Sequence, residues 1–210
     1  MMRNVFRWAS LATFVASLAL VACAADDSKA KQGTATDPDK KPDCVYVPTP
    51  HDVTAKMLEM AHVKKTDVVY DPGCGDGRLC VTAAKKYGCK AIGFEIEPSL
   101  VEQAKKNAKR RNVEHLVSIQ KKDIFKLDYS QANVLTLYLL PDMLKRLLPS
   151  FEKMAPGSRI VAHNYELPGI LPDEQTEILS KEDNDKHTLY AYKLPLRRAA
   201  AGPAAASSAP

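Results

Sequence analysis

The 210-residue chain has no Cys-x-x-Cys pair and only five histidines, which are scattered along its length. Cysteine and histidine are the usual protein ligands of zinc, so this shortage argues against a zinc site. The chain also lacks the roughly 20 consecutive apolar residues that a membrane-spanning helix needs. A large excess of positive or negative residues is missing as well. The formal net charge of +5 is modest and gives no reason to expect a nucleic acid partner.

What is present is the composition of a folded, soluble protein. Hydrophobic residues make up 45% of the chain and charged residues 26%, which a disordered chain would not combine. The length suits one domain of ordinary size with additional tails. No internal repeat is visible.

Residues 1–22 have the layout of a secretory signal, in which Arg3 and Arg7 precede an apolar run from Trp8 to Ala22 and acids follow it. The stretch "LVAC" at residues 20–23 resembles the lipobox of bacterial lipoproteins. That resemblance implies cleavage before Cys23 and attachment of lipid to its side chain. We therefore expect an exported protein that is anchored at a membrane surface through Cys23.

Three alternatives to this anchor remain open. Ordinary signal cleavage could occur near Ala22 or Ala25, or the apolar run could stay on the protein as a helix. A misassigned translation start would instead leave the protein in the cytoplasm. This last alternative is awkward, because after Met2 the next methionine is Met57, inside the expected domain.

Composition also predicts the domain boundaries. Residues 23–43 are small, charged and proline-bearing, which is typical of a disordered linker. Residues 197–210, "RRAAAGPAAASSAP", are of similarly low complexity and are expected to form a disordered tail. The folded domain is therefore predicted to span residues 44–196.

Four cysteines remain if a fifth carries lipid: Cys44, Cys74, Cys80 and Cys89. An exported chain could pair some of them as disulfides. Free and mostly buried thiols are an equally good interpretation.

Apolar strand patterns and amphipathic helix patterns alternate through the domain. Strands are expected in "DVVYD", "KAIGFEI", "VSIQKKD", "NVLTLYLL", "SRIVAHNY" and "HTLYAYKL", and helices in residues 52–62, 77–88, 98–112 and 141–154. Apolar strands joined through helices predict a doubly wound α/β fold with a mostly parallel sheet. The alternation in the final strand favours an antiparallel strand at or near the edge.

The stretch "VVYDPGCGDGR" at residues 68–78 places Gly73, Gly75 and Gly77 at the end of a predicted strand and the start of a helix. Glycines there allow a tight turn and a close approach of the backbone to a ligand. The dinucleotide-binding pattern would be Gly-x-Gly-x-x-Gly. Its third glycine is replaced here by Arg78.

Acidic residues at three strand ends indicate which ligand this loop binds. Asp71 and Asp76 would repel a pyrophosphate but suit an ammonium group. Glu95 ends the second strand, near the spacing of about 20 residues at which an acid holds ribose hydroxyls. Asp123 ends the third strand, where it could accept a hydrogen bond from an adenine amino group. A ligand with an ammonium, a ribose and an adenine but no phosphate is S-adenosylmethionine.

The motifs "VVYDPGCGDGR", "GFEIEP", "KKDIF" and "LTLYLLP" resemble those of class I S-adenosylmethionine-dependent methyltransferases. With "YVPTPHDVTAKMLEMA", they resemble in particular the small single-domain branch related to mitochondrial lysine methyltransferases that act on the c-ring protein of ATP synthase. The similarity covers residues 45 to about 194. It implies that Tyr46 and Thr49 belong to a loop over the cofactor. It also implies that the methionine part is held by Asp71, Gly73, Gly75 and Gly77, the ribose by Glu95 and the adenine by Asp123.

The methyl acceptor is harder to predict. A lysine acceptor must lose its ammonium proton before it attacks, and an apolar channel favours this by lowering the lysine pKa. Tyr138 in "LYLLP" lies where class I enzymes contact their acceptor, and we predict it as the catalytic residue. A core tyrosine is the alternative. His163 and Glu166 are further candidates.

Methyl transfer to a protein lysine is therefore the predicted function, with no metal site and no nucleic acid partner. A small-molecule methyltransferase and an exported, non-catalytic binding module that kept the cofactor fold are the alternatives.

Overall fold

The structure is a computed structural model that describes residues 41–199. The predicted signal peptide, Cys23, most of the predicted linker and most of the predicted tail lie outside the described residues.

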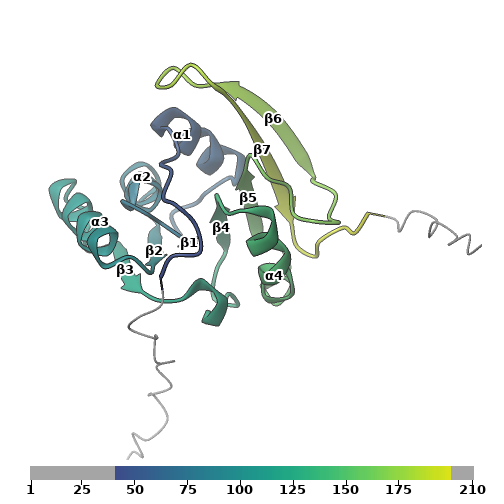
Figure 1. Ribbon diagram of the computed structural model, residues 1–210, viewed down its shortest axis with the longest axis horizontal. Helices are drawn as coiled ribbons and strands as arrows, with labels where there is room; N and C mark the ends of the chain where they lie inside the picture. Colours follow the sequence, from purple (N-terminus) through teal and green to yellow (C-terminus); the bar gives the residue numbers. More distant parts are fainter. Residues whose placement is uncertain (1–40, 200–210) are drawn as a thin grey trace, which may run out of the picture. The chain divides into compact units, whose positions relative to one another are not determined.

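The described residues form a seven-stranded sheet in the order β3-β2-β1-β4-β5-β7-β6 (Figure 1). Its strands are β1 (Val68–Pro72), β2 (Lys90–Glu95), β3 (Val117–Lys121), β4 (Val134–Leu137), β5 (Arg159–His163), β6 (Glu174–Leu179) and β7 (Lys186–Lys193). The first five strands of this order pair in parallel. Strand β7 pairs antiparallel with β5 and with β6. This arrangement confirms the predicted doubly wound α/β fold, including β1 and β2 as parallel neighbours.

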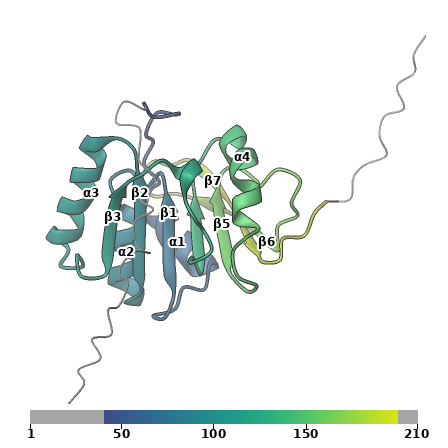
Figure 2. The same ribbon diagram turned by 90° about the horizontal axis from the view of Figure 1, so that it is seen from below.

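Helices cover both faces of the sheet (Figure 2). They are α1 (His51–Met60), α2 (Arg78–Tyr87), α3 (Pro98–Arg110) and α4 (Pro141–Phe151), with a short 3₁₀ helix η1 (Ile124–Lys126). One hydrophobic cluster contains Val53 of α1, Leu79 of α2 and Ala108 of α3. A second contains Leu144 and Phe151 of α4. Because both faces are covered, the central strands are apolar along their length rather than alternating.

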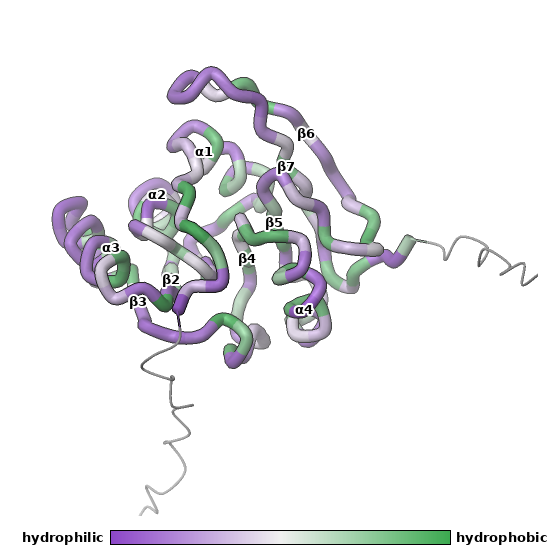
Figure 3. The backbone as a smooth tube through the Cα atoms, viewed as in Figure 1, coloured by the Kyte–Doolittle hydropathy of each residue, from purple (hydrophilic) through white to green (hydrophobic). Residues whose placement is uncertain are grey.

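The edge strand β6 was not predicted, whereas the predicted antiparallel last strand at or near the edge is confirmed. Strand β7 is antiparallel as expected, but it lies second from the edge and β6 lies outside it. Strand β6 is mostly exposed and carries Glu174 and Glu177, and Figure 3 shows much of it as hydrophilic. Charged residues are common on edge strands because they discourage pairing with another chain. The same charges hide the strand from a search for apolar runs.

The order of the strands places the ligand site. The chain runs from β1 to β2 on one side and later returns to β4 on the other side of β1. The sheet therefore has its switch point at β1. In such sheets the carboxyl ends of the strands beside the switch point border a crevice that binds ligands.

Candidate active site

The loop that follows β1 is held against β2 by its own backbone. The N–H groups of Gly73 and Cys74 both donate to the carbonyl oxygen of Phe94, at 2.8 and 3.1 Å. Gly73, Gly75 and Gly77 all have positive φ angles, of 76°, 53° and 75°. Only glycine adopts this conformation without strain, so the spacing of the three residues reflects the path of the loop.

Two of these glycines also make room for neighbouring side chains. A Cβ atom on Gly75 would lie 2.1 Å from Cε2 of the Tyr46 ring, and one on Gly77 would lie 2.9 Å from Cβ of Ala104 in α3. Gly73 lines the pocket described below. The sequence predicted that all three hold the cofactor. In the structure Gly73 faces the pocket, whereas Gly75 lies under Tyr46 and Gly77 packs against α3.

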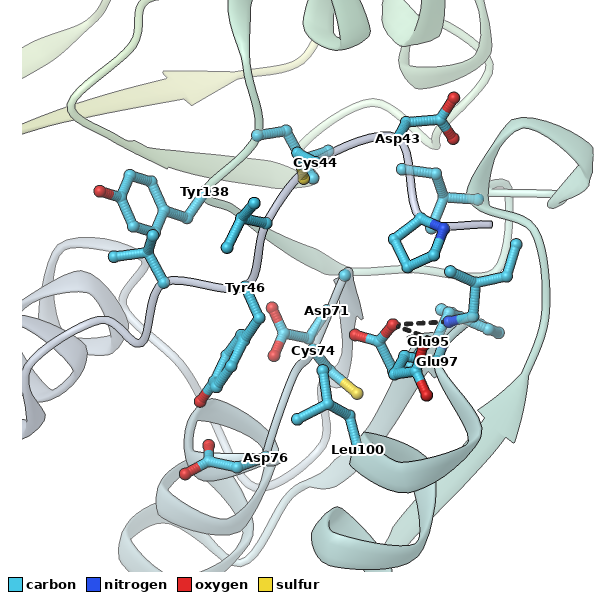
Figure 4. A pocket seen from close by; sticks show the side chains of 18 of the residues that line it. Asp43, Cys44, Tyr46, Asp71, Cys74, Asp76, Glu95, Glu97, Leu100 and Tyr138 are labelled. Carbon is cyan, nitrogen blue, oxygen red and sulfur yellow. Dashed lines mark hydrogen bonds between the residues drawn. The ribbon is translucent and has the colours of Figure 1, made fainter. Parts of the chain in front are cut away.

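Glu95 ends β2 and is almost fully buried, with 7% of its surface exposed. One carboxylate oxygen accepts from the N–H of Gly75 at 3.0 Å. The other accepts from those of Ile96 and Glu97 at 2.7 and 3.0 Å, and Figure 4 shows dashed lines from Glu95 to this neighbouring backbone. The glycine loop and the end of β2 are thus joined through one carboxylate. A carboxylate has about four acceptor positions, so one is left for a ligand hydroxyl.

Asp71 lies at the carboxyl-terminal end of β1, where it is 6% exposed. Its carboxylate accepts from the Thr136 hydroxyl at 2.9 Å. Burial raises the pKa of Asp71 to about 7 against the opposing effect of the Thr136 hydrogen bond, and the negative charges of Glu95 and Asp76 raise it further. A cationic group bound in this pocket would favour the charged form of Asp71, because its attraction would oppose both the cost of burial and the repulsion by Glu95 and Asp76.

Asp123 follows β3, is buried and lines the same pocket. Its carboxylate accepts from the N–H of Phe125 at 3.0 Å and so caps η1. The structure therefore brings the three predicted acids, Asp71, Glu95 and Asp123, together at the carboxyl ends of three adjacent parallel strands. Their contacts with a cofactor stay a prediction.

Arg78 connects the glycine loop to the segment of residues 41–49. Its side chain makes an ion pair with Asp76 at 2.9 Å and donates to the backbone carbonyl of Thr49 at 2.9 Å. The sequence pattern identifies Arg78 only as the missing third glycine. A cation at the first position of a helix is unfavourable next to the positive end of the helix dipole. This position could therefore have indicated that Arg78 has a partner outside the helix.

Segment 41–49 lies across the loop. Figure 4 shows the Tyr46 ring beside the loop with its hydroxyl pointing toward Asp76. Burial raises the pKa of Tyr46 to about 12, and the charge of Asp76 contributes. Tyr46 and Thr49 both line the pocket, in agreement with the predicted position of a covering loop.

The resulting pocket has a volume of about 840 Å³ and extends from Glu95 and Asp123 to Tyr138. This lies within the range of about 300–1,000 Å³ that is usual for pockets of small ligands and cofactors. Its wall combines buried acids with apolar side chains such as Leu100, Ile124 and Leu139. A ligand with cationic and hydroxyl groups on an apolar frame fits this lining.

Tyr138 lies at the far side of the pocket from Glu95 (Figure 4), and the ring of His163 packs against it. Their ring centroids are 4.0 Å apart. His163 is 1% exposed, and burial, together with its neighbour His187, lowers its pKa to about 3. Glu166 is exposed and does not line the pocket. Of the three acceptor-site candidates, Tyr138 lines the pocket, His163 packs against its ring without lining the pocket itself, and Glu166 lies outside.

The four cysteines that the structure describes are free thiols. Burial raises the pKa of the Cys74 and Cys80 thiols well above the ordinary value, which keeps them protonated. Within residues 41–199, no group of three or more His, Cys, Asp or Glu side chains could hold a metal ion. In the same range, no helix is long and apolar enough to cross a membrane.

Comparison with known proteins identifies relatives of this chain. The family description of the ANTKMT methyltransferase domain matches residues 71–174. The chain is 41% identical over 153 residues to a protein-lysine N-methyltransferase of Saccharolobus islandicus, covering 72% of this chain and 94% of that one. It is 30% identical over 129 residues to the ATP synthase c-subunit lysine N-methyltransferase of Xenopus laevis, covering 61% of this chain but only 56% of that one.

Among solved structures, the chain is similar to a crystal structure of an RNA methyltransferase from Salinibacter ruber in complex with S-adenosyl-L-homocysteine. The two are 40% identical with a TM-score of 0.66, and the match covers 75% of this chain and 97% of that one.

Proposed function

Because this chain belongs to the ANTKMT family of class I S-adenosylmethionine-dependent methyltransferases, we propose that it methylates the side-chain amine of a lysine in a protein. Methyl transfer and the use of S-adenosylmethionine follow from the family. The lysine acceptor is supported mainly by one observation, the 41% identity to a protein-lysine N-methyltransferase that the chain matches over 94% of its length.

The residues of the pocket fit the cofactor. When bound, S-adenosylmethionine supplies a methyl group that is already activated by a sulfonium. Asp71 is a buried carboxylate whose charged neighbours, Glu95 and Asp76, are both negative, and it therefore suits the methionine ammonium. Glu95 keeps one acceptor position for the ribose, as inferred above, and Asp123 lies on the third strand end, where the adenine is expected.

The chain then has to align the acceptor and keep water away. Tyr46 and the rest of segment 41–49 cover the glycine loop, and Arg78 holds that segment in place. Tyr138 forms the opposite end of the pocket wall, where an incoming amine would be oriented. Transfer is an in-line displacement, so this alignment is a large part of the rate enhancement. Val45 and Val47 line the pocket and are exposed, and their apolar side chains suit the aliphatic part of a lysine.

An acid-hydrolysis assay distinguishes this acceptor from the alternatives. The full chain is incubated with methyl-labelled S-adenosylmethionine and either total bacterial protein, total RNA or a low-molecular-weight extract. We expect label in ε-N-methyllysine after hydrolysis of the protein fraction. Label in methylated nucleosides alone would instead match the RNA methyltransferase of Salinibacter ruber. Label only in small molecules would support the small-molecule alternative.

A binding measurement addresses the non-catalytic alternative. Calorimetry with S-adenosylhomocysteine separates a chain that binds the cofactor from one that does not. Binding without label in any of the three fractions would favour an exported binding module that kept the cofactor fold.

We also propose that the protein is exported and anchored at a membrane surface through lipid on Cys23. The support is the sequence of residues 1–23, where arginines, an apolar run and "LVAC" follow one another. One lipidated cysteine places a domain at a membrane without spanning it. Fractionation of cells labelled with a lipid precursor tests this. A cytosolic protein that retains residues 1–22 would overturn the proposal and would simplify access to the cofactor.

A further inference from the structure

A row of four side chains leads from the pocket to the surface. Thr49 lines the pocket, and its hydroxyl lies 3.2 Å from Nδ1 of His163. Nε2 of His163 lies 2.8 Å from Nδ1 of His187. Nε2 of His187 lies 3.1 Å from a carboxylate oxygen of Asp183. Asp183 has a side-chain exposure of 38%, and the row therefore ends at solvent.

The ends of this row determine the direction of every hydrogen bond in it. A carboxylate only accepts, so His187 carries its proton on Nε2 and donates it to Asp183. When each imidazole carries one proton, Nδ1 of His187 then accepts from Nε2 of His163. Nδ1 of His163 in turn accepts from the Thr49 hydroxyl. All three bonds therefore point outward, which is the direction in which a proton would leave the pocket.

The inner part of the row is dry. Thr49, His163 and His187 are 6%, 1% and 7% exposed, and the Tyr138 ring covers His163 at 4.0 Å. The oxygen of the Thr49 hydroxyl keeps lone pairs that can accept from a donor in the pocket. A lysine ammonium at the Tyr138 end of the pocket would be such a donor.

We propose that Thr49, His163, His187 and Asp183 form a proton relay that removes the ammonium proton of the acceptor lysine. This inference rests on the proposed function. The ammonium gives a proton to the Thr49 oxygen, and the Thr49 hydroxyl proton passes to Nδ1 of His163. The Nε2 proton of His163 passes to Nδ1 of His187. The amine keeps the electron pair that forms the new bond to the methyl carbon.

The proton ends on His187 as an imidazolium next to the Asp183 carboxylate, from where its Nε2 proton is released to water. The pKa of His163, lowered to about 3 by burial and by His187, supports this order because His163 passes a proton on and does not retain it. Other charged or titratable groups nearby include Tyr138 and Tyr165, which stack at 6.4 Å, and Arg78, which donates to the carbonyl oxygen of Thr49. Asp52 of α1 reaches this region through the Ser180 hydroxyl.

The test is the pH dependence of kcat for the full chain, measured with the protein in which methyllysine is found. His187→Gln and Thr49→Val remove a link of the relay, and Thr49→Ser keeps the hydroxyl. Loss of general base catalysis lowers rates by about 10²–10⁴-fold. We therefore expect such a loss at pH 7 for the first two variants and little loss for Thr49→Ser. The kcat of these two variants should approach that of the wild type as the pH approaches the lysine pKa of about 10.4, where the amine needs no base.

Three controls make the result decisive. His115→Gln changes an exposed histidine outside the row and should match the wild type at every pH. Asp183→Asn changes the exposed end of the row and is the variant to measure in place of His187→Gln if the latter does not fold. Calorimetry with S-adenosylhomocysteine should give affinities for the His187 and Asp183 variants within about twofold of the wild type.

The relay and the proposed function fail differently. A wild-type protein that methylates lysine, with a rate loss in the variants that is the same at every pH, would show a structural role for the row and overturn the relay alone. A wild-type protein that binds S-adenosylhomocysteine but methylates no lysine would overturn the proposed function and the relay with it.

Discussion

The contact between Gly75 and the Tyr46 ring provides the sharpest test of how the site is built. An alanine at position 75 would keep the left-handed backbone, with φ at 53°, at a cost of about 1–2 kcal/mol. Its Cβ atom would also lie 2.1 Å from one ring carbon of Tyr46 and under 3 Å from two more. The three nearest atoms all belong to the Tyr46 ring, so the ring has to move away.

Displacing the ring adds a second cost. Burying an aromatic side chain contributes about 1.5–3 kcal/mol, and Tyr46 is 37% exposed, so about 1–2 kcal/mol is lost with it. We expect Gly75→Ala to lower the free energy of unfolding by about 2–4 kcal/mol in urea denaturation. We also expect affinity for S-adenosylhomocysteine, measured by calorimetry, to fall about tenfold or more, about 1.4 kcal/mol, because the covering segment is displaced.

A matched variant separates the two costs. Gly169 also has a positive φ, of 74°, but a Cβ atom there would have no neighbour within 4 Å. Gly169→Ala should therefore lower the free energy of unfolding only by the cost of the left-handed backbone, and it should leave cofactor affinity unchanged. In a Tyr46→Ala background, Gly75→Ala should cost no more than Gly169→Ala. If Gly75→Ala behaves like Gly169→Ala while Tyr46 is present, the ring does not lie over the loop as described and the reasoning is refuted.

Three further variants test other parts of the site. Glu95→Ala should weaken binding of S-adenosylhomocysteine by about 1–3 kcal/mol through lost charge-assisted hydrogen bonds, and an unchanged affinity in calorimetry would remove Glu95 from the site. Asp71 has a pKa of about 7 in the folded state against an ordinary value of 3.8. The folded state therefore binds this proton more tightly than the unfolded state does. As the pH rises from about 4 to about 7, this carboxyl lowers the free energy of unfolding. Asp71→Asn should remove that decline, so that the cofactor-free variant is the more stable protein at pH 8 by up to about 4 kcal/mol in guanidinium unfolding; equal slopes with pH would contradict this. Arg78→Gln should speed hydrogen exchange in residues 43–49 and raise the dissociation rate of S-adenosylhomocysteine, whereas unchanged exchange would show that the Arg78 contact with Thr49 does not hold the segment.

Much of the fold and part of the candidate site could be predicted from local patterns. Apolar strands that alternate with amphipathic helices determine a doubly wound sheet, because each helix must return the chain to a parallel neighbour. The carboxyl ends of parallel strands meet at one edge of the sheet. For this reason Asp71, Glu95 and Asp123, each recognised at the end of its own strand, lie around one pocket in the structure.

Other features depend on contacts between distant parts of the chain, which no local pattern encodes. Strand β6 is charged and exposed, and it is a strand because β7 offers it an unpaired edge. Thr49 and His163 are 114 residues apart, and they meet because segment 41–49 crosses the ends of the strands. His163 and His187 are brought together by the antiparallel register of β5 and β7, which pairs His163 with Leu189. The sequence alone thus determined the parallel strands and the acids at their ends, whereas strand β6, the contacts of segment 41–49 and the row of histidines follow from long-range packing that only the tertiary structure decides.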